Sequence, residues 1–291
     1  MTQIKLPLRS VSQINQYTKC PTAYKLSRID KVWQRPAAWL PQGTAFHAVA
    51  EAVEVWESYG MPLTLDEAKD MFRWHYANDV GAFTEETPNF EWWTWSGPYN
   101  GQRDIERRYE VGLEQVEKFF AWRETPGQEI WVTPDGTPAI ELYFEIVLGL
   151  DPSCPVHVHG LADEDCDCGG TPIKVRGYID AVVVVDGELR VRDYKTGNQP
   201  GDDFQLGVYA LAVAMTYGVE APKTGDYFMA GKKGKKAKPT VPYDLTKWTE
   251  EAITAEFQRI EEGIEAAVFE PDPEPDKCKF CDVSYSCPVF K

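Results

Sequence analysis

Apolar residues recur every three or four positions along much of the N-terminal part of the chain, which is the spacing of an amphipathic helix. Proline cannot continue a helical hydrogen-bond ladder, so Pro21 interrupts the first of these segments. Thr64 and Glu67 have the spacing of a capping box at the start of another. The pattern predicts helical segments at 10–30, 44–59, about 65–78 and about 102–123.

From residue 129 onward the pattern changes to short apolar or alternating runs, which are typical of β-strands. The strand segments predicted are 129–133, 139–149, a hairpin over 176–197, 224–230 and 239–243. A helix over 203–217 stops at Gly218, and a final helix over about 247–268 is followed by three prolines within 269–277. This order predicts an α/β (α+β) fold with a central mixed β-sheet flanked by helices.

The hairpin "RGYIDAVVVVDGELRVRDYKTG" carries charges in an otherwise apolar strand pair. Asp186-Gly187 predicts a two-residue turn, which places Asp180 directly opposite Asp193. Lys195 shares the face of Asp193 because side chains alternate along a strand. Two facing carboxylates repel each other unless a positive charge lies between them, and Mg²⁺ and Mn²⁺ prefer oxygen ligands. The pattern therefore favours a divalent-metal site over a solvated polar face in which Lys195 neutralises one Asp.

The chain is acidic, with 291 residues, a formal net charge of −16 and an isoelectric point near 4.7. This charge argues against a general nucleic-acid coat protein but does not exclude a nuclease with an acidic metal site. One basic patch, "GKKGKKAK" at 231–238, is either a solvated hairpin tip or a phosphate contact. There is no apolar run of membrane-spanning length and no signal peptide at the N-terminus, so we expect a cytoplasmic protein without a membrane partner.

The seven cysteines are unevenly distributed. In a cytoplasmic chain they indicate metal or redox chemistry more than disulfides. Cys20 is isolated, whereas Cys278, Cys281 and Cys287 crowd the C-terminal end. A third group lies in an irregular insertion at 150–172, which either binds zinc or is a flexible surface loop. Its candidate zinc ligands are Cys154, His157, His159, Cys166 and Cys168.

Several segments together resemble the PD-(D/E)xK nuclease superfamily, specifically its RecB-like branch with an iron–sulfur cluster. The matching segments are "GTAFHAVAE", "IELYFE", "RGYIDAV", "RDYKTG" and "DDFQLGVYAL", followed by the terminal cysteines. That branch includes CRISPR-associated exonucleases and the nuclease domains of AddB-type recombination proteins. One departure is that "GYID" stands where the superfamily's named proline would be, as is common in this branch. The resemblance implies a restriction-endonuclease-like core.

The resemblance implies a metal centre in which His47, Asp180 and Asp193 are ligands of Mg²⁺ or Mn²⁺. Glu141 completes this site directly or through a water molecule, and Glu145, on the same face of its strand, is the alternative. A metal held by these groups would polarise a phosphodiester and lower the pKa of a bound water.

The resemblance also assigns the remaining catalytic roles. Lys195 is the catalytic lysine, which positions the water or stabilises negative charge developing on phosphorus. Gln205 and Tyr209 are one helical turn apart, project together, and match the extra motif with which the branch orients its substrate. Asp180, Asp193, Lys195, Glu141, Gln205 and Tyr209 therefore make up the expected catalytic set.

The cysteine pattern resembles the cluster motif of the same branch, with Cys20 as the isolated N-terminal ligand and Cys278, Cys281 and Cys287 as the C-terminal three. Four thiolates suit either tetrahedral zinc or a [4Fe–4S] cluster, and spacing alone does not decide between them. The resemblance implies the [4Fe–4S] cluster, which would join the two ends of the chain.

These observations predict one nuclease domain over 1–291. Within it we expect an iron–sulfur clasp formed by 1–30 together with 270–291. A helical region follows at 31–128, and the nuclease core, which contains the 150–172 insertion, at 129–268. The expected activity is metal-dependent exonuclease cleavage of single-stranded DNA ends in recombination, repair or DNA processing, with recombination or CRISPR-type proteins as partners. The alternatives are a structure-specific endonuclease and a non-catalytic DNA-binding assembly subunit; a zinc interaction module would leave Asp180, Asp193 and Lys195 unexplained.

Overall fold

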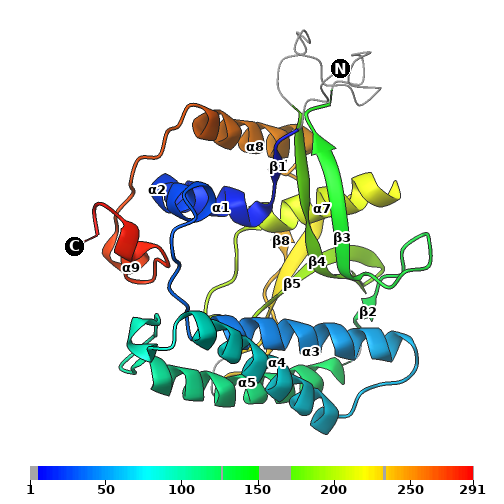
Figure 1. Ribbon diagram of the computed structural model, residues 1–291. Helices are drawn as coiled ribbons and strands as arrows, with labels where there is room; N and C mark the ends of the chain where they lie inside the picture. The colour runs from blue at the N-terminus through cyan, green and yellow to red at the C-terminus, as the bar shows by residue number, and fades with distance from the viewer. Residues whose placement is uncertain (1–5, 126, 151–171, 232–233, 291) are drawn as a thin grey trace.

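A mixed β-sheet lies at the centre of the molecule (Figure 1). The computed structural model describes residues 6–125, 127–150, 172–231 and 234–290, and this part of the chain contains eight strands in one sheet. β4 pairs in parallel with β1 and antiparallel with β2, β3 and β5, while β5 pairs in parallel with β6. The strands are β1 (Leu8–Arg9), β2 (Glu129–Ile130), β3 (Ile140–Leu148), β4 (Ile173–Val185), β5 (Glu188–Lys195), β6 (Thr224–Met229), β7 (Lys238–Pro239) and β8 (Tyr243–Asp244).

Helices cover the sheet on both sides, which confirms the predicted fold class (Figure 1). One apolar core joins the sheet to α1 (Val11–Lys19), α7 (Asp203–Tyr217) and α8 (Glu250–Glu265). A second core joins the opposite face to α3 (Leu40–Ser58), α4 (Leu65–Glu86) and α5 (Gly101–Arg123). Within the described residues, no helix has the length and apolar character needed to cross a membrane.

Several predicted local signals are present. Thr64 and Glu67 form the capping box of α4, and Gly218 ends α7 in the left-handed conformation with φ of 65°. Asp186 and Gly187 both have positive φ, 54° and 83°, as a two-residue hairpin turn of the I′ type requires. The register that follows from this turn is the predicted one, running from Val185 opposite Glu188 to Ala181 opposite Arg192.

Some boundaries differ from the sequence-based expectation. α3 begins at Leu40, because Pro41 and the following residues complete its first turn, and α4 continues to Glu86. β2 is limited to two residues. The predicted 10–30 helix is broken into α1, α2 (Pro21–Tyr24) and a π-helical turn over Lys25–Ile29.

One edge of β4 has no strand partner among the described residues over part of its length. Both β1 and β3 pair with Lys174 and Val175, so they lie on opposite edges of β4. Both β3 and β5 pair with Ala181, so β1 and β5 share one edge. Between Val175 and Ala181, no strand of the described residues pairs with that edge. The opening lies next to Asp180.

An N-terminal and a C-terminal segment of the chain are held together. Tyr17 in α1 donates a hydrogen bond to the carbonyl of Val268 (2.6 Å), and Thr22 in α2 donates one to the carbonyl of Phe269 (2.7 Å). The Tyr17 and Phe269 rings also pack edge to face. The chain then continues past the prolines into α9 (Pro275–Lys279), which lies near α2 in Figure 1.

Candidate active site

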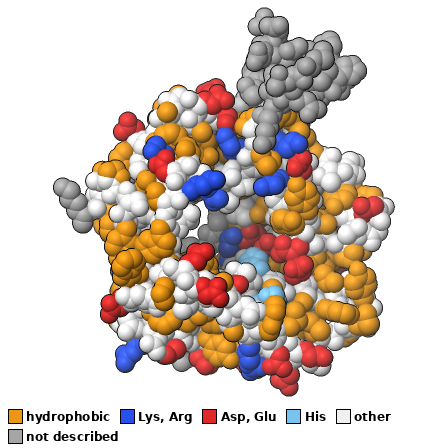
Figure 2. All heavy atoms as spheres, in the orientation of Figure 1, with side chains coloured by type: hydrophobic (Ala, Val, Ile, Leu, Met, Phe, Trp, Pro, Cys, Tyr) orange, Lys and Arg blue, Asp and Glu red, His pale blue; other side chains and the backbone are white. Residues whose placement is uncertain are grey.

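Three side chains from different elements converge beside the open edge of β4. His47 from α3, Glu141 from β3 and Asp180 from β4 each bring a ligand atom within 4.8 Å of the other two. His47 Nδ1 lies 3.5 Å from Asp180 Oδ2. One imidazole nitrogen and two carboxylates form a donor set suited to a first-row divalent metal. Figure 2 shows acidic and histidine side chains gathered in a central hollow, with Lys and Arg side chains above it.

The backbone bends where two of these residues meet. Ile179 belongs to the core with α7, whereas Ala181 belongs to the core with α3, although residues two apart share a face in a regular strand. The face of β4 therefore shifts at Asp180. Glu141 lies at the facing position of β3 and has a φ of 46°, which is rare for a non-glycine residue within a strand. This irregular pair brings the two carboxylates together beside His47.

Asp193 and Lys195 lie on the neighbouring strand. The ladder between β4 and β5 ends at Ala181 and Arg192, and Asp180 and Asp193 follow as the next residues. Asp180 Oδ2 accepts a hydrogen bond from the backbone nitrogen of Tyr194 (2.7 Å), so its carboxylate reaches across to β5. Lys195 Nζ lies 2.7 Å from Asp193 Oδ2.

α7 supplies the remaining polar groups. Gln205 Nε2 donates to Asp193 Oδ1 (2.7 Å) and lies 2.8 Å from the hydroxyl oxygen of Tyr209. The start of α7 is fixed by Asp202, whose side chain accepts a hydrogen bond from the Gln205 backbone nitrogen. Gln205 and Tyr209 thus project together towards Asp193, as their spacing predicts.

The site concentrates negative charge in a partly dry environment. Burial and, secondarily, the charge of Asp180 raise the pKa of Glu141 to about 7. Burial and the same Asp180 charge raise the pKa of Asp193 to about 6, although Lys195 opposes this shift. A bound cation would relieve both effects, because an opposite charge favours the ionised carboxylates. The residues present therefore fit a divalent metal ion.

The structure separates the two candidate glutamates. Glu145 forms an ion pair with Lys174 (3.0 Å) and accepts a hydrogen bond from the Tyr143 hydroxyl (3.1 Å). It does not belong to the group of ligand atoms that His47, Glu141 and Asp180 bring within 4.8 Å of one another. Sequence reasoning did not single out Glu51, whose charge also raises the pKa of Glu141. Its position one helical turn after His47 is the signal that would have identified it.

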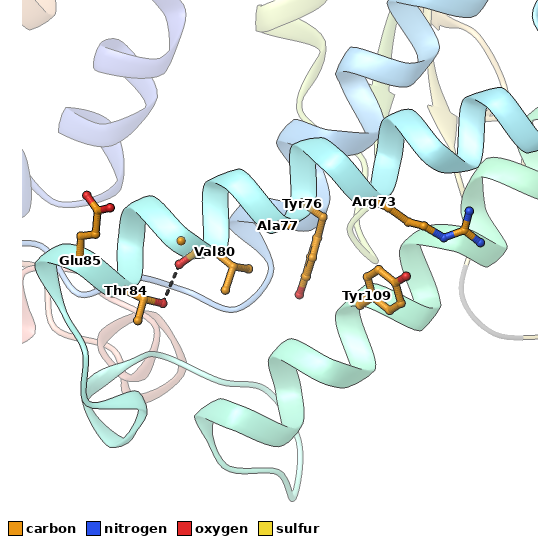
Figure 3. Close-up of a pocket in the computed structure, with 8 residues that line it drawn as sticks. Arg73, Tyr76, Ala77, Val80, Thr84, Glu85 and Tyr109 are labelled. Atoms are coloured by element: carbon orange, nitrogen blue, oxygen red, sulfur yellow. Dashed lines mark hydrogen bonds between the residues drawn. The ribbon is translucent and has the colours of Figure 1, made fainter.

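A different hollow lies between α4 and α5 (Figure 3) and contains none of the predicted site residues. Tyr76 donates its hydroxyl to the Ile105 carbonyl, and Thr84 donates to the Val80 carbonyl, both at 2.6 Å. These polar groups are already satisfied within the protein. The lining is otherwise mostly apolar, and its residues are Arg73, Tyr76, Ala77, Val80, Gly81, Thr84, Glu85 and Tyr109.

Comparison with known proteins decides the family. A family model described as the PD-(D/E)XK nuclease superfamily matches residues 9–288. The chain belongs to the PD-(D/E)XK nuclease superfamily. Nucleases of this superfamily use divalent metals, in agreement with the donor set of His47, Glu141 and Asp180.

Two bacteriophage proteins are similar to this PD-(D/E)XK chain over its full length. The Gene 69 protein of Mycobacterium phage D29 is 85% identical over 291 residues, with 100% of both chains covered. The Gene 69 protein of Mycobacterium phage L5 is 63% identical over 309 residues, covering 100% of this chain and 99% of the relative.

Two solved structures show weaker likeness. A candidate exonuclease from Eubacterium rectale has a TM-score of 0.46 and 13% identity, covering 97% of this chain and 88% of its own. SSO0001 has a TM-score of 0.35 and 16% identity, covering 65% of this chain and 77% of its own. Because both TM-scores are below 0.5, these likenesses add nothing to the family assignment.

Four cysteines of this PD-(D/E)XK chain line one cavity where its two ends meet. Cys20 precedes α2, and Cys278, Cys281 and Cys287 come from the C-terminal segment. Burial raises the pKa of the Cys281 thiol, and nearby Cys20 and Cys287 raise it further. Among the described residues, no three cysteine sulfurs lie within 4.8 Å of one another.

Two sequence-based hypotheses fall wholly or partly outside the described residues. The candidate zinc ligands Cys154, His157, His159, Cys166 and Cys168 all lie outside them. In the lysine patch, Lys232 and Lys233 do so as well, whereas Lys235, Lys236 and Lys238 are described.

Proposed function

We propose that this protein is a divalent-metal-dependent DNA exonuclease that hydrolyses phosphodiester bonds at single-stranded ends. The observation that carries the proposal is the convergence of His47, Glu141 and Asp180, with Asp193 and Lys195 beside them, in a chain of the PD-(D/E)XK superfamily. A degenerate, non-catalytic member would be expected to lack part of the Asp–Asp–Lys set. This chain retains all three residues.

In this proposal His47, Asp180 and Glu141 hold Mg²⁺ or Mn²⁺, and Asp193 contributes to the same centre. When bound, the metal polarises the phosphodiester and lowers the pKa of a water ligand. The high carboxylate density supports this assignment, because Glu141 and Asp193 have raised pKa values without a cation.

Lys195 is proposed as the catalytic lysine. Its ammonium lies against Asp193 and over the ring of Tyr227, 5.4 Å from the ring centroid, and 30% of its side chain is exposed. It can therefore reach a phosphate bound beside Asp193 and stabilise negative charge that develops there. Gln205 is proposed to keep Asp193 oriented, and Tyr209 to fix the amide of Gln205.

We also propose that the chain is a RecB-like member, organised as one nuclease domain over 1–291 and closed by a [4Fe–4S] clasp. The common cavity of Cys20, Cys278, Cys281 and Cys287 supports the clasp. The split of one cysteine near the N-terminus from three near the C-terminus is what the resembling branch shows with iron–sulfur clusters, and it favours a cluster over a single zinc ion. The clasp would add to the hydrogen bonds that already join the chain ends.

The test compares linear with circular single-stranded DNA in Mg²⁺ or Mn²⁺. An exonuclease degrades end-labelled linear strands to mononucleotides or short products and leaves circles intact. Cleavage of circles at a comparable rate would replace the proposal with an endonuclease. Stable binding without cleavage of either substrate would indicate a DNA-binding assembly subunit.

A further inference from the structure

Two exposed tyrosines face each other across β3 and β4. Tyr143 and Tyr178 are register partners, with ring centroids 5.3 Å apart and an interplanar angle of 58°. They remain 48% and 56% exposed although they contact each other. Together they present a broad aromatic surface to solvent.

This surface adjoins the candidate metal centre. Tyr143 is two residues after Glu141, and Tyr178 is two residues before Asp180, so the rings occupy the next pair of positions on the same strands. Two residues of a strand span about 7 Å. Stacked nucleotides of one strand rise about 3.4 Å each, so about two nucleotides cover this distance.

Two cationic side chains and one carboxylate lie beyond the rings. Arg176 is exposed and pairs in register with Glu145. Lys174, whose ammonium lies 3.0 Å from the Glu145 carboxylate, pairs with Val147 one further position along the same face. The order on β4 is therefore carboxylate, aromatic ring, guanidinium and ammonium. A nucleotide strand presents a reacting phosphate, a base and further phosphates, which matches this order chemically.

We propose that Tyr143 and Tyr178 form a stacking platform for a base of the single-stranded substrate next to the reacting phosphate. The proposal deepens, and rests on, the proposed nuclease function. A base inside a duplex is stacked and paired, so its face is not available to these rings. The platform would therefore accept only an unpaired base, so the substrate has to be single-stranded at this site. Tyr143 and Tyr178 act as positioning residues.

The test uses steady-state cleavage of an end-labelled single strand by Tyr143→Ala, Tyr178→Ala and the double variant. Loss of base–aromatic stacking should raise KM about 5- to 150-fold while kcat changes much less. The Phe variants keep the rings and should restore the wild-type KM. Tyr59→Ala is the matched control, because Tyr59 is 65% exposed at the end of α3, 12 residues and about 18 Å along the helix from His47. This control should cleave normally.

A series of substrates, each with one abasic position, identifies the stacked base. At one position near the cut, removal of the base should raise the KM of the wild type by a similar factor. The same abasic substrate should leave the KM of the double variant unchanged. Equal effects of the abasic site on both proteins, or a normal KM in the double variant, would overturn the platform. If wild-type protein cuts no DNA, the proposed function fails instead.

Discussion

At the scale of single residues, the site depends on carboxylates that repel one another when no cation is bound. Asp180 is the charge that links them, because it raises the pKa of both Glu141 and Asp193. Lys195 offsets part of this repulsion at Asp193, and its side chain also remains 30% exposed. Lys195 could therefore be either a structural neutraliser or a catalytic group, and the two roles differ in outcome.

Lys195→Ala should lower the rate of cleavage at saturating metal by at least about 100-fold, the cost typical of losing one donor that stabilises a transition state. Metal binding should survive, because the ammonium is not a metal ligand. Calorimetric titration with Mn²⁺ and single-turnover cleavage separate these effects. If the variant binds metal poorly but cuts normally once saturated, Lys195 only neutralises Asp193.

Glu141 should make the metal-free protein sensitive to pH. Its folded-state pKa of about 7 exceeds the ordinary value of 4.5, so the folded state binds the proton more tightly than the unfolded state. This contribution to stability is complete below the ordinary value and is lost as pH rises through about 7. In EDTA, Glu141→Gln should therefore raise the melting temperature at pH 8 but not at pH 4. Equal differences at both pH values would contradict this origin.

At the scale of elements, the residues of the hairpin turn account for most of the correct predictions. Asp186-Gly187 set the register of β4 and β5 and hence the proximity of Asp180 to Asp193. The spacing of Gln205 and Tyr209 likewise predicted their contact on α7. The positive φ of Glu141 was not predictable, because glutamate rarely adopts it and only tertiary packing can impose it. The short parallel pairing of β1 was missed for a different reason, because two residues carry too little pattern.

A buried ion pair joins two parallel strands next to Asp193. Arg192 on β5 and Asp226 on β6 are register partners, with side chains 1% and 0% exposed and two hydrogen bonds of 2.6 and 2.8 Å. Arg192→Leu leaves the carboxylate buried without this partner and should lower the free energy of unfolding by about 3–5 kcal/mol. Urea denaturation measures this loss.

The matched control is Arg192→Leu combined with Asp226→Leu, which removes both charges. It should be markedly more stable than Arg192→Leu alone, because no buried charge is left unpaired. If the single and double variants lose the same stability, the cost comes from packing rather than charge.

At the scale of the whole molecule, an N-terminal segment around residues 17–26 meets a C-terminal segment that almost the full length of the chain separates from it. The cysteine pattern suggested this meeting, and the cavity shared by Cys20 and the three C-terminal cysteines agrees with it. The hydrogen bonds of Tyr17 and Thr22 to the chain after α8 were not predictable, because their acceptors are backbone carbonyls, which every residue has. These two hydrogen bonds hold Val268 and Phe269, just before the prolines. Cys20 precedes this segment in the sequence, and the three C-terminal cysteines follow it.

Cys20→Ala should remove the cluster as completely as loss of a C-terminal cysteine. Protein made with ample iron should lose its broad absorption near about 400 nm, the expectation for Cys₄ iron–sulfur ligation, together with its iron and sulfide. Its C-terminal segment beyond Phe269 should become more sensitive to limited proteolysis, because without the cluster it is held by noncovalent contacts such as the packing of Phe280 on Trp39 and of Tyr285 on Trp33. Cys154→Ala should keep the colour. One zinc per chain, without iron or sulfide in the wild type, would contradict the cluster and leave the nuclease centre unaffected.

The central claim is that the carboxylates around Asp180 form a metal-dependent nuclease centre. The most direct measurement is a metal titration of single-stranded DNA cleavage by wild type, Asp193→Ala and Asp70→Ala, where Asp70 is an exposed control on α4 with a side chain 77% exposed. The account predicts cleavage by wild type and Asp70→Ala that rises with Mg²⁺ or Mn²⁺ and stops in EDTA. It predicts no cleavage by folded Asp193→Ala at any metal concentration. Normal cleavage by Asp193→Ala, or wild-type cleavage that persists in EDTA, would contradict it.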